Sequence, residues 1–165
     1  MTATPETVQS VVNSNKKPLS TKEYHPLESL FYLGYAESSV IEVYKDDNIE
    51  LKVKFRTITP AEIRDITEAV DNYSSQAAQI VTERIETLAR SIISINYMPL
   101  VLTKDEQQAF FDEYKRQPSP LEMAQKVLRE KIKSMLVIDS MYEKYIEFSN
   151  GIMTQFEEAK KKLKD

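Results

Sequence analysis

Three short motifs constrain the fold of this chain most, because each one marks the first residue of a helix. The motifs are Thr59-Pro60-Ala61-Glu62, Thr103-Lys104-Asp105-Glu106 and Ser119-Pro120-Leu121-Glu122. In each motif the hydroxyl of Thr or Ser and the carboxylate of Glu are spaced to accept each other's backbone N–H groups, an arrangement called a capping box. Proline at the first helical position costs no hydrogen bond there. The motifs therefore predict helices that begin near residues 60, 104 and 120.

The spacing of apolar residues predicts how far the helices extend. The longest amphipathic run lies within residues 76–96, where apolar side chains recur at every third or fourth position, as Ala78, Val81, Ile85, Leu88, Ala89, Ile92 and Ile95. We expect this helix to form the core through one wide apolar face, with Glu83, Glu86 and Arg90 on the opposite face. Glu86 and Arg90 are also spaced for an ion pair along the helix.

The chain as a whole predicts a bundle of about four to six helices. The expected ranges are about residues 60–71, 76–96, 104–116, 120–148 and 151–164. The break before the last helix is placed at Ser149-Asn150-Gly151, because Asn and Gly tolerate the backbone conformation at which helices end.

A strict alternation between residues 49 and 56 predicts a β-strand. Its apolar face contains Ile49, Leu51, Val53 and Phe55, and charged residues alternate with them. This is the period-two pattern of a half-buried strand. The segment Val40–Tyr44 is its natural partner, and Asp46-Asp47-Asn48 supplies the turn. We predict a β-hairpin over residues 39–57 that packs on the helices, because two strands alone are only marginally stable. The fold class is mainly α with one β-hairpin (α+β).

The first residues of the chain differ from the rest in composition. Residues 1–24 contain few large aliphatic side chains, so we expect a flexible arm ahead of a single domain over residues 25–165. The arm has no apolar segment after a positive start and does not read as a secretory signal. The segment Pro26–Gly34 is abruptly apolar. It is either a short helix that caps the protein's own core or a motif that docks on a partner.

Composition argues against several classes of function. The chain has two glycines and no cysteine, so glycine-rich phosphate loops and thiolate metal sites have no residues to form them. Its only histidine, His25, has no second His to share a metal, and we expect no catalytic residue, cofactor or metal. Asp139, within an apolar run, is expected to be a bonded or boundary carboxylate. A net charge of −4 predicts no nucleic-acid surface, and no apolar run is long enough to cross a membrane.

The apolar residues of the last helices suggest binding of a protein partner or of a second copy of the chain. Tyrosine is frequent at interface hot spots, and methionine adapts to varied apolar surfaces. The candidate partner-binding residues are Leu30, Phe31, Met135, Met141, Tyr142, Tyr145, Met153 and Phe156. For each single residue, packing in the protein's own core is the alternative.

Two segments resemble a known family of proteins. They are Arg56-Thr57-Ile58-Thr59-Pro60-Ala61-Glu62 and Leu88-Ala89-Arg90-Ser91-Ile92-Ile93-Ser94-Ile95-Asn96. The first fits the pattern R-x-[LI]-T-x-x-E after a strand, and the second fits L-A-R-S-I-x-S-I-N. Over about residues 49–100 the chain resembles the small tail assembly chaperones and baseplate assembly proteins of long-tailed bacteriophages. In that pattern a glycine often follows the final Asn, where this chain has Tyr97.

The resemblance implies a non-enzymatic, α-rich protein made during phage infection. Such proteins engage an aggregation-prone tail component, for example the tape measure or a baseplate hub subunit, in the cytoplasm of the host bacterium. The resemblance brings no catalytic residues. Two alternatives stay open: a structural tail or baseplate subunit retained in the virion, and a helical adaptor unrelated to phage.

Overall fold

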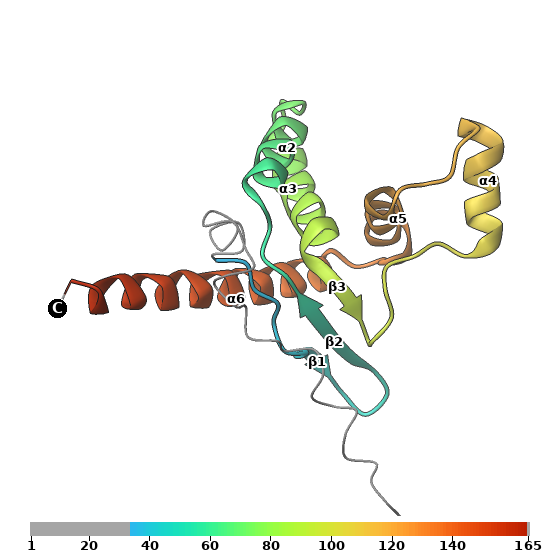
Figure 1. Ribbon diagram of the computed structural model, residues 1–165. Helices are drawn as coiled ribbons and strands as arrows, with labels where there is room; N and C mark the ends of the chain where they lie inside the picture. Colours follow the sequence, from blue (N-terminus) through green and yellow to red (C-terminus); the bar gives the residue numbers. More distant parts are fainter. Residues whose placement is uncertain (1–33, 165) are drawn as a thin grey trace, which may run out of the picture. The chain divides into compact units, whose positions relative to one another are not determined.

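The computed structural model describes residues 34–164, and this part of the chain contains a three-stranded antiparallel sheet (Figure 1). The strands are β1 (Ile41–Lys45), β2 (Glu50–Phe55) and β3 (Ile92–Ile95). They lie in the order β1-β2-β3, so β2 is central. The first two strands confirm the hairpin predicted over residues 39–57. Its turn is closed by the carboxylate of Asp46, which accepts the backbone N–H groups of Asn48 and Ile49 at 2.8 and 2.7 Å.

Five α-helices and one π-helical turn make up most of the remaining described chain. They are α2 (Pro60–Asp71), α3 (Gln76–Ser91), α4 (Lys104–Tyr114), α5 (Pro120–Lys126), the π-helix η1 (Val127–Lys131) and α6 (Met135–Lys162). All three capping boxes are formed as the motifs predict, at the starts of α2, α4 and α5. The described residues therefore have the predicted α+β fold.

The helix predicted over residues 76–96 is too long, because the chain changes to a strand after Ser91. Ile92 already has extended backbone angles, and no loop separates α3 from β3 (Figure 1). Isoleucine is β-branched and favours strands, and Ile92-Ile93-Ser94-Ile95 contains three of them. The open edge of β2 supplies the partners, with Val53 opposite Ile95 and Phe55 opposite Ile92. Pairing with β2 thus overrides the helical spacing.

The break predicted at Ser149-Asn150-Gly151 is also wrong, since α6 continues through it to Lys162 (Figure 1). Glycine inside a helix costs only about 1 kcal/mol relative to alanine. The real break lies before α6, where Ile132 is extended and Ser134 precedes the new helix. One straight helix over residues 120–148 would be about 40 Å long. It could not return both Leu128 and Ile138 to the same core, and the turn between η1 and α6 allows this.

The core lies between one face of the sheet and helices α3, α5 and α6. Its largest fully buried side chains are Val53, Phe55, Leu88, Leu128 and Met141. Burial of each such side chain contributes roughly 1.5–3 kcal/mol. The ring of Phe55 meets Tyr145 edge-on at 5.8 Å and stacks with Phe148 at 6.5 Å. These contacts fix α6 against the central strand.

Helix α3 is enclosed on more than one side. Every residue from Ile85 to Ser91 is buried, because α6 packs on α3 and α5 with η1 packs on it as well. The sequence places Glu86 and Arg90 on a polar outer face, and the structure corrects this: their exposed fractions are 3% and 9%. The sequence predicts the apolar face of α3 correctly, but it does not predict that α5 and η1 also cover the helix.

Some predictions concern residues outside the described range. They are the flexible arm over residues 1–24, the apolar segment Pro26–Gly34 up to residue 33, and His25. Within residues 34–164, no helix combines the length and the apolar character needed to cross a membrane.

The turn after β3 holds two residues in the left-handed region. Asn96 has φ 47° and Tyr97 has φ 66°, and Ile95 and Met98 exchange two backbone hydrogen bonds of 2.9 Å around them. The side chain of Asn96 accepts the N–H of Lys52 at 2.7 Å and donates to the carbonyl of Glu50. Such two-residue turns favour Asn-Gly, so Tyr97 occupies a position that suits glycine.

We therefore expect Tyr97→Gly to leave the protein as stable or to stabilise it, by up to about 1 kcal/mol. The side chain of Tyr97 is 69% exposed, so its removal sacrifices little packing. Tyr97→Val should destabilise, because a β-branched residue tolerates positive φ poorly. Urea denaturation followed by circular dichroism measures both changes. A Gly variant clearly less stable than the Val variant would contradict this explanation.

Candidate functional site

An open groove lies between α3 and the turn that joins η1 to α6. Its volume is about 570 Å³. The lining residues are Tyr73, Ala77, Ala78, Val81, Thr82, Ile85, Leu128, Arg129, Ile132, Lys133, Ser134, Met135 and Ile138. Residues from α3 form one wall, residues from η1 and the start of α6 form the other, and Tyr73 comes from the connection before α3. Most of these side chains are apolar.

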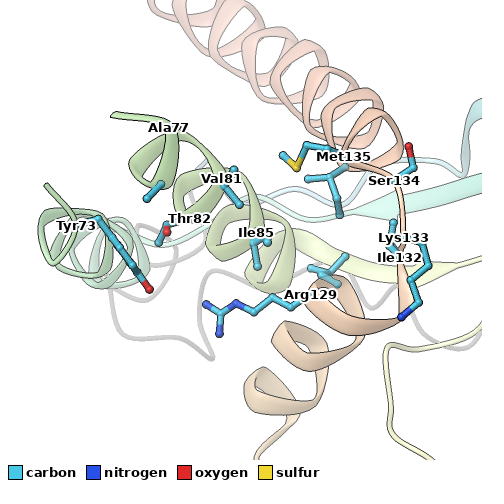
Figure 2. A pocket seen from close by; sticks show the side chains of 13 residues that line it. Tyr73, Ala77, Val81, Thr82, Ile85, Arg129, Ile132, Lys133, Ser134 and Met135 are labelled. Carbon is cyan, nitrogen blue, oxygen red and sulfur yellow. The ribbon is translucent and has the colours of Figure 1, made fainter. Parts of the chain in front are cut away.

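Figure 2 shows how the two walls of this groove face each other. Val81 and Ile85 follow one side of α3, and Ile132 and Met135 lie across from them. Val81 is 38% exposed and Met135 is 37% exposed. The groove thus offers apolar side chains that are accessible, on a floor formed by buried core residues. Ala77 adds a small side chain that leaves room along α3.

The charged residues that line the groove are both basic. Arg129 donates to the buried carboxylate of Glu86 at 2.8 Å while remaining half exposed. Lys133 donates to the backbone carbonyl of Glu130 and is also exposed. The lining contains no Asp or Glu. An occupant with carboxylates beside its apolar residues therefore complements this groove in charge.

Behind Arg129 lies a buried polar network that joins three helical elements. The carboxylate of Glu86 on α3 accepts hydrogen bonds from Arg90 one turn later, from Gln125 on α5 at 2.9 Å, and from Arg129 on η1. A buried carboxylate is tolerated only when it is well paired. The network therefore fixes α5 and η1 against α3, and with them one wall of the groove.

The sequence indicates only part of this network. The spacing of Glu86 and Arg90 predicts their ion pair, and the structure confirms it. Gln125 and Arg129 were missed, because which side of α5 and η1 faces α3 depends on the turn between η1 and α6. Their own spacing of four residues is the one signal that places both on the same helical side.

Two Arg–Glu pairs brace the starts of α2 and α5 in the same way. Arg56 donates to both carboxylate oxygens of Glu62, at 3.0 and 2.6 Å. Arg116 does the same to Glu122, at 2.8 and 2.6 Å. Each Glu also completes the capping box of its helix. The spacing Arg-x-x-[Thr/Ser]-Pro-x-Glu occurs at both places, so a comparison of the two segments with each other could have predicted the second pair.

The Arg56–Glu62 pair borders a second cavity of about 510 Å³. Arg56 and Glu62 lie on one side of it, and Ser119 and Pro120 at the start of α5 line another part. Because the guanidinium group of Arg56 holds the carboxylate of Glu62 at two points, its charge is already satisfied within the chain. We interpret this cavity as a packing gap between helices and strands, and we interpret the two ion pairs as contacts that stabilise helix starts.

The candidate partner-binding residues fall into separate places. Met135 lines the groove. Tyr142 does not line it and is half-buried on α6, with Arg84 over its ring at 5.6 Å. Met141 and Tyr145 are in the core, at 0% and 4% exposed, because their side of α6 faces the sheet. These two present no surface to a partner. The others lie elsewhere: Met153 and Phe156 on the exposed end of α6, and Leu30 and Phe31 outside the described residues.

Asp139 has the role that its apolar surroundings predict. Its carboxylate forms an ion pair with Arg84 on α3, and both side chains are about one-third exposed. It is therefore a bonded boundary carboxylate. In the part of the chain that the structure describes, no three His, Asp or Glu side chains gather where they could hold a metal ion.

Known proteins provide no relative from which a site could be transferred. No protein-family model, curated protein or solved structure matches the chain significantly. The interpretation of the groove therefore depends on its own residues: accessible apolar walls, a basic rim, and a buried network that holds one wall in place.

The buried network predicts a large effect of Glu86→Ala on stability. Removal of the carboxylate leaves the buried guanidinium of Arg90 without its partner, which costs about 3–5 kcal/mol for a buried pair. Urea denaturation should show this loss. Glu83→Ala, an exposed position on the same helix, is the control and should change the free energy of unfolding by less than about 1 kcal/mol. Equal effects of the two substitutions would show that the network contributes nothing special.

The paired glutamates of two capping boxes, Glu122 and Glu106, predict how stability depends on pH. The hydrogen bond from Arg116 lowers the pKa of Glu122 from 4.5 to about 2, and the one from Lys131 does the same for Glu106. Both carboxylates thus bind protons more readily in the unfolded chain. Their stabilisation is complete above pH 4.5 and is lost as the pH falls from there through about 2.

We expect thermal unfolding followed by circular dichroism to show a falling melting temperature over that range. Glu122→Gln should make the dependence less steep, because the side chain no longer titrates. Glu158→Gln, on the exposed end of α6, is the matched control. A wild-type slope in the Glu122→Gln variant would refute this assignment.

Proposed function

We propose that this chain is a non-enzymatic binding protein that holds an apolar segment of a partner protein in the groove between α3 and the η1–α6 turn. The observation that supports this most directly is the groove itself, with accessible apolar side chains from both walls and only basic charges in its lining. Grooves of this kind accept the apolar face of an amphipathic helix. Binding would shield that face from water.

Charge narrows the class of partner. Arg129 and Lys133 border the apolar walls, so a segment with Glu or Asp beside its apolar residues fits better than one with Lys or Arg. The pair of Arg129 with Glu86 leaves half of the Arg129 side chain exposed. An acidic partner would share this guanidinium with Glu86 without displacing it.

The partner we propose is a tail or baseplate component of a long-tailed bacteriophage. The support is the resemblance of Arg56–Glu62 and Leu88–Asn96 to the tail assembly chaperones and baseplate assembly proteins. A transient shield for an aggregation-prone component, acting in the cytoplasm of the host bacterium, needs an accessible apolar groove and no catalytic group. The two alternatives predict other binding partners: a structural subunit would stay bound to tail or baseplate proteins in the virion, and an adaptor would bind proteins unrelated to phage.

Substitution within the groove tests the binding mode. The probes are two fluorescent amphipathic peptides with the same apolar face, flanked by Glu in one and by Lys in the other. We expect the Glu peptide to bind more tightly, and Val81→Asp to weaken it by at least about tenfold, because the new carboxylate would be buried against apolar groups. Fluorescence anisotropy measures both affinities.

Ile80→Asp is a closely matched control. Ile80 is the preceding residue of α3 and is 39% exposed, against 38% for Val81, but it does not line the groove. It should leave the affinity unchanged. Equal affinity for the two peptides, or equal loss in the two variants, would rule out the groove as the binding site.

The phage assignment has a separate test. The chain should co-purify with a tail or baseplate protein from infected cells, and Val81→Asp should abolish this. Mass spectrometry of purified mature particles then distinguishes the two phage roles. Presence of the chain at stoichiometric amounts would replace the transient role with that of a virion subunit.

A further inference from the structure

Among the described residues 34–164, none covers the last turns of α6. Every residue from Met153 to Lys164 is exposed. Three of them are large and apolar: Met153 at 60%, Phe156 at 38% and Leu163 at 87% exposed. An uncovered helical end of this length is only marginally stable in water, and most helical stability comes from packing of an apolar face. A covering partner would supply that packing.

The exposed apolar residues of α6, together with Leu163 directly after its last residue, follow the spacing of a coiled coil. Ile146 and Met153 are seven residues apart, and Phe156 and Leu163 are also seven apart. The two sets are offset by three residues, so together they form one stripe with the 3–4 repeat that coiled coils require. Ile146 is 36% exposed, so the stripe begins beside Tyr145 and Phe148, which pack in the core. It extends over about 25 Å of helix.

A second copy of α6 running in the opposite direction matches this stripe. In that arrangement Ile146 faces Leu163 of the second copy, and Met153 faces Phe156 of the second copy. Symmetry then repeats both pairs. Ser149 of each copy faces Lys160 of the other, so two polar layers lie among the apolar ones. The Nζ of Lys160 lies over the ring of Phe156, 5.4 Å from the ring centre.

The charges beside the stripe select the antiparallel direction. Glu143 and Lys164 occupy the flanking position at opposite ends of the stripe, and both are exposed. In the antiparallel pair, Glu143 of each copy meets Lys164 of the other, so two ion pairs form. In a parallel pair, Glu143 and Lys164 would instead face the uncharged Ile138 and Ala159 of the other copy, and neither ion pair could form. Charge thus favours a second copy over an unrelated helix of arbitrary sequence.

We propose that two copies of this chain associate through an antiparallel pair of α6 helices, along the stripe formed by Ile146, Met153, Phe156 and Leu163. The dimer is independent of the groove at α3, because no residue of the stripe lines it. The interface is short, at the lower end of the areas that specific complexes bury. The dimer therefore dissociates on dilution.

Cross-linking tests the direction of the pair, and the chain has no cysteine to interfere. Ile146→Cys and Leu163→Cys chains are prepared separately, then mixed and mildly oxidised. The mixture should give a disulfide-linked dimer of one chain of each kind, whereas each variant alone should stay monomeric on a non-reducing gel. Self-linking of either variant alone, or no link in the mixture, would overturn the antiparallel register.

Charge reversal tests the selection of the second copy. Sedimentation equilibrium should show a wild-type dimer that dissociates on dilution. Glu143→Lys and Lys164→Glu should each weaken it by roughly tenfold, since each reverses two pairs per dimer. The double variant Glu143→Lys/Lys164→Glu should return to the wild-type dissociation constant.

Two further variants separate the stripe from the rest of α6. Met153→Asp should give a monomer, because it places a charge in the central layer. Leu136→Asp should dimerise as wild type does, although Leu136 is 76% exposed, since it lies about 15 Å along α6 before the stripe begins. A wild-type protein that stays monomeric at several hundred micromolar, or a double charge variant that is not restored, would reject the proposal.

Discussion

The burial of α3 on several sides is the constraint on which the rest of this structure depends. A helix with a charged face can be enclosed only if the charges on that face are paired. The carboxylate of Glu86 meets this condition by accepting bonds from Arg90, Gln125 and Arg129. These bonds hold α5 and η1 against the charged side of α3, opposite its apolar face. The chain that leaves η1 must therefore turn before α6 begins. The groove is a by-product of that turn, because its second wall is the chain that leaves η1 for α6.

The local features of the fold could be predicted from the sequence, and the features that depend on packing could not. Helix starts and the hairpin follow from bonds between near neighbours, so Thr59, Thr103, Ser119 and the alternation around Val53 indicate them correctly. The end of α3 depends on the distant edge of β2, which converts Ile92–Ile95 from helix to strand. The break before α6 depends on the need to return Leu128 and Ile138 to one core. The wall of the groove on α3 could be predicted from the apolar spacing of that helix. The other wall could not, because it depends on where the chain breaks before α6.

The repeated spacing at Arg56–Glu62 and Arg116–Glu122 bears on the proposed link to phage proteins. One of the two segments on which that proposal rests has a counterpart elsewhere in the same chain, and both act as braces at helix starts. Arg90 of the other segment belongs to the buried network, and Asn96 closes the turn after β3. The similar residues therefore describe a scaffold. The residues proposed to contact partners, on the rim of the groove and along α6, lie mainly outside them.

The direct passage of α3 into β3 has a consequence for how the domain comes apart. Strand β3 can leave β2 only if the end of α3 moves with it, and α3 can separate from α6 only by withdrawing the third strand of the sheet. No flexible loop lies between them to absorb either motion. The sheet and the helical core are therefore joined in one cooperative unit, in which partial opening is suppressed. The uncovered end of α6 lies outside this unit and can fray while the core stays closed.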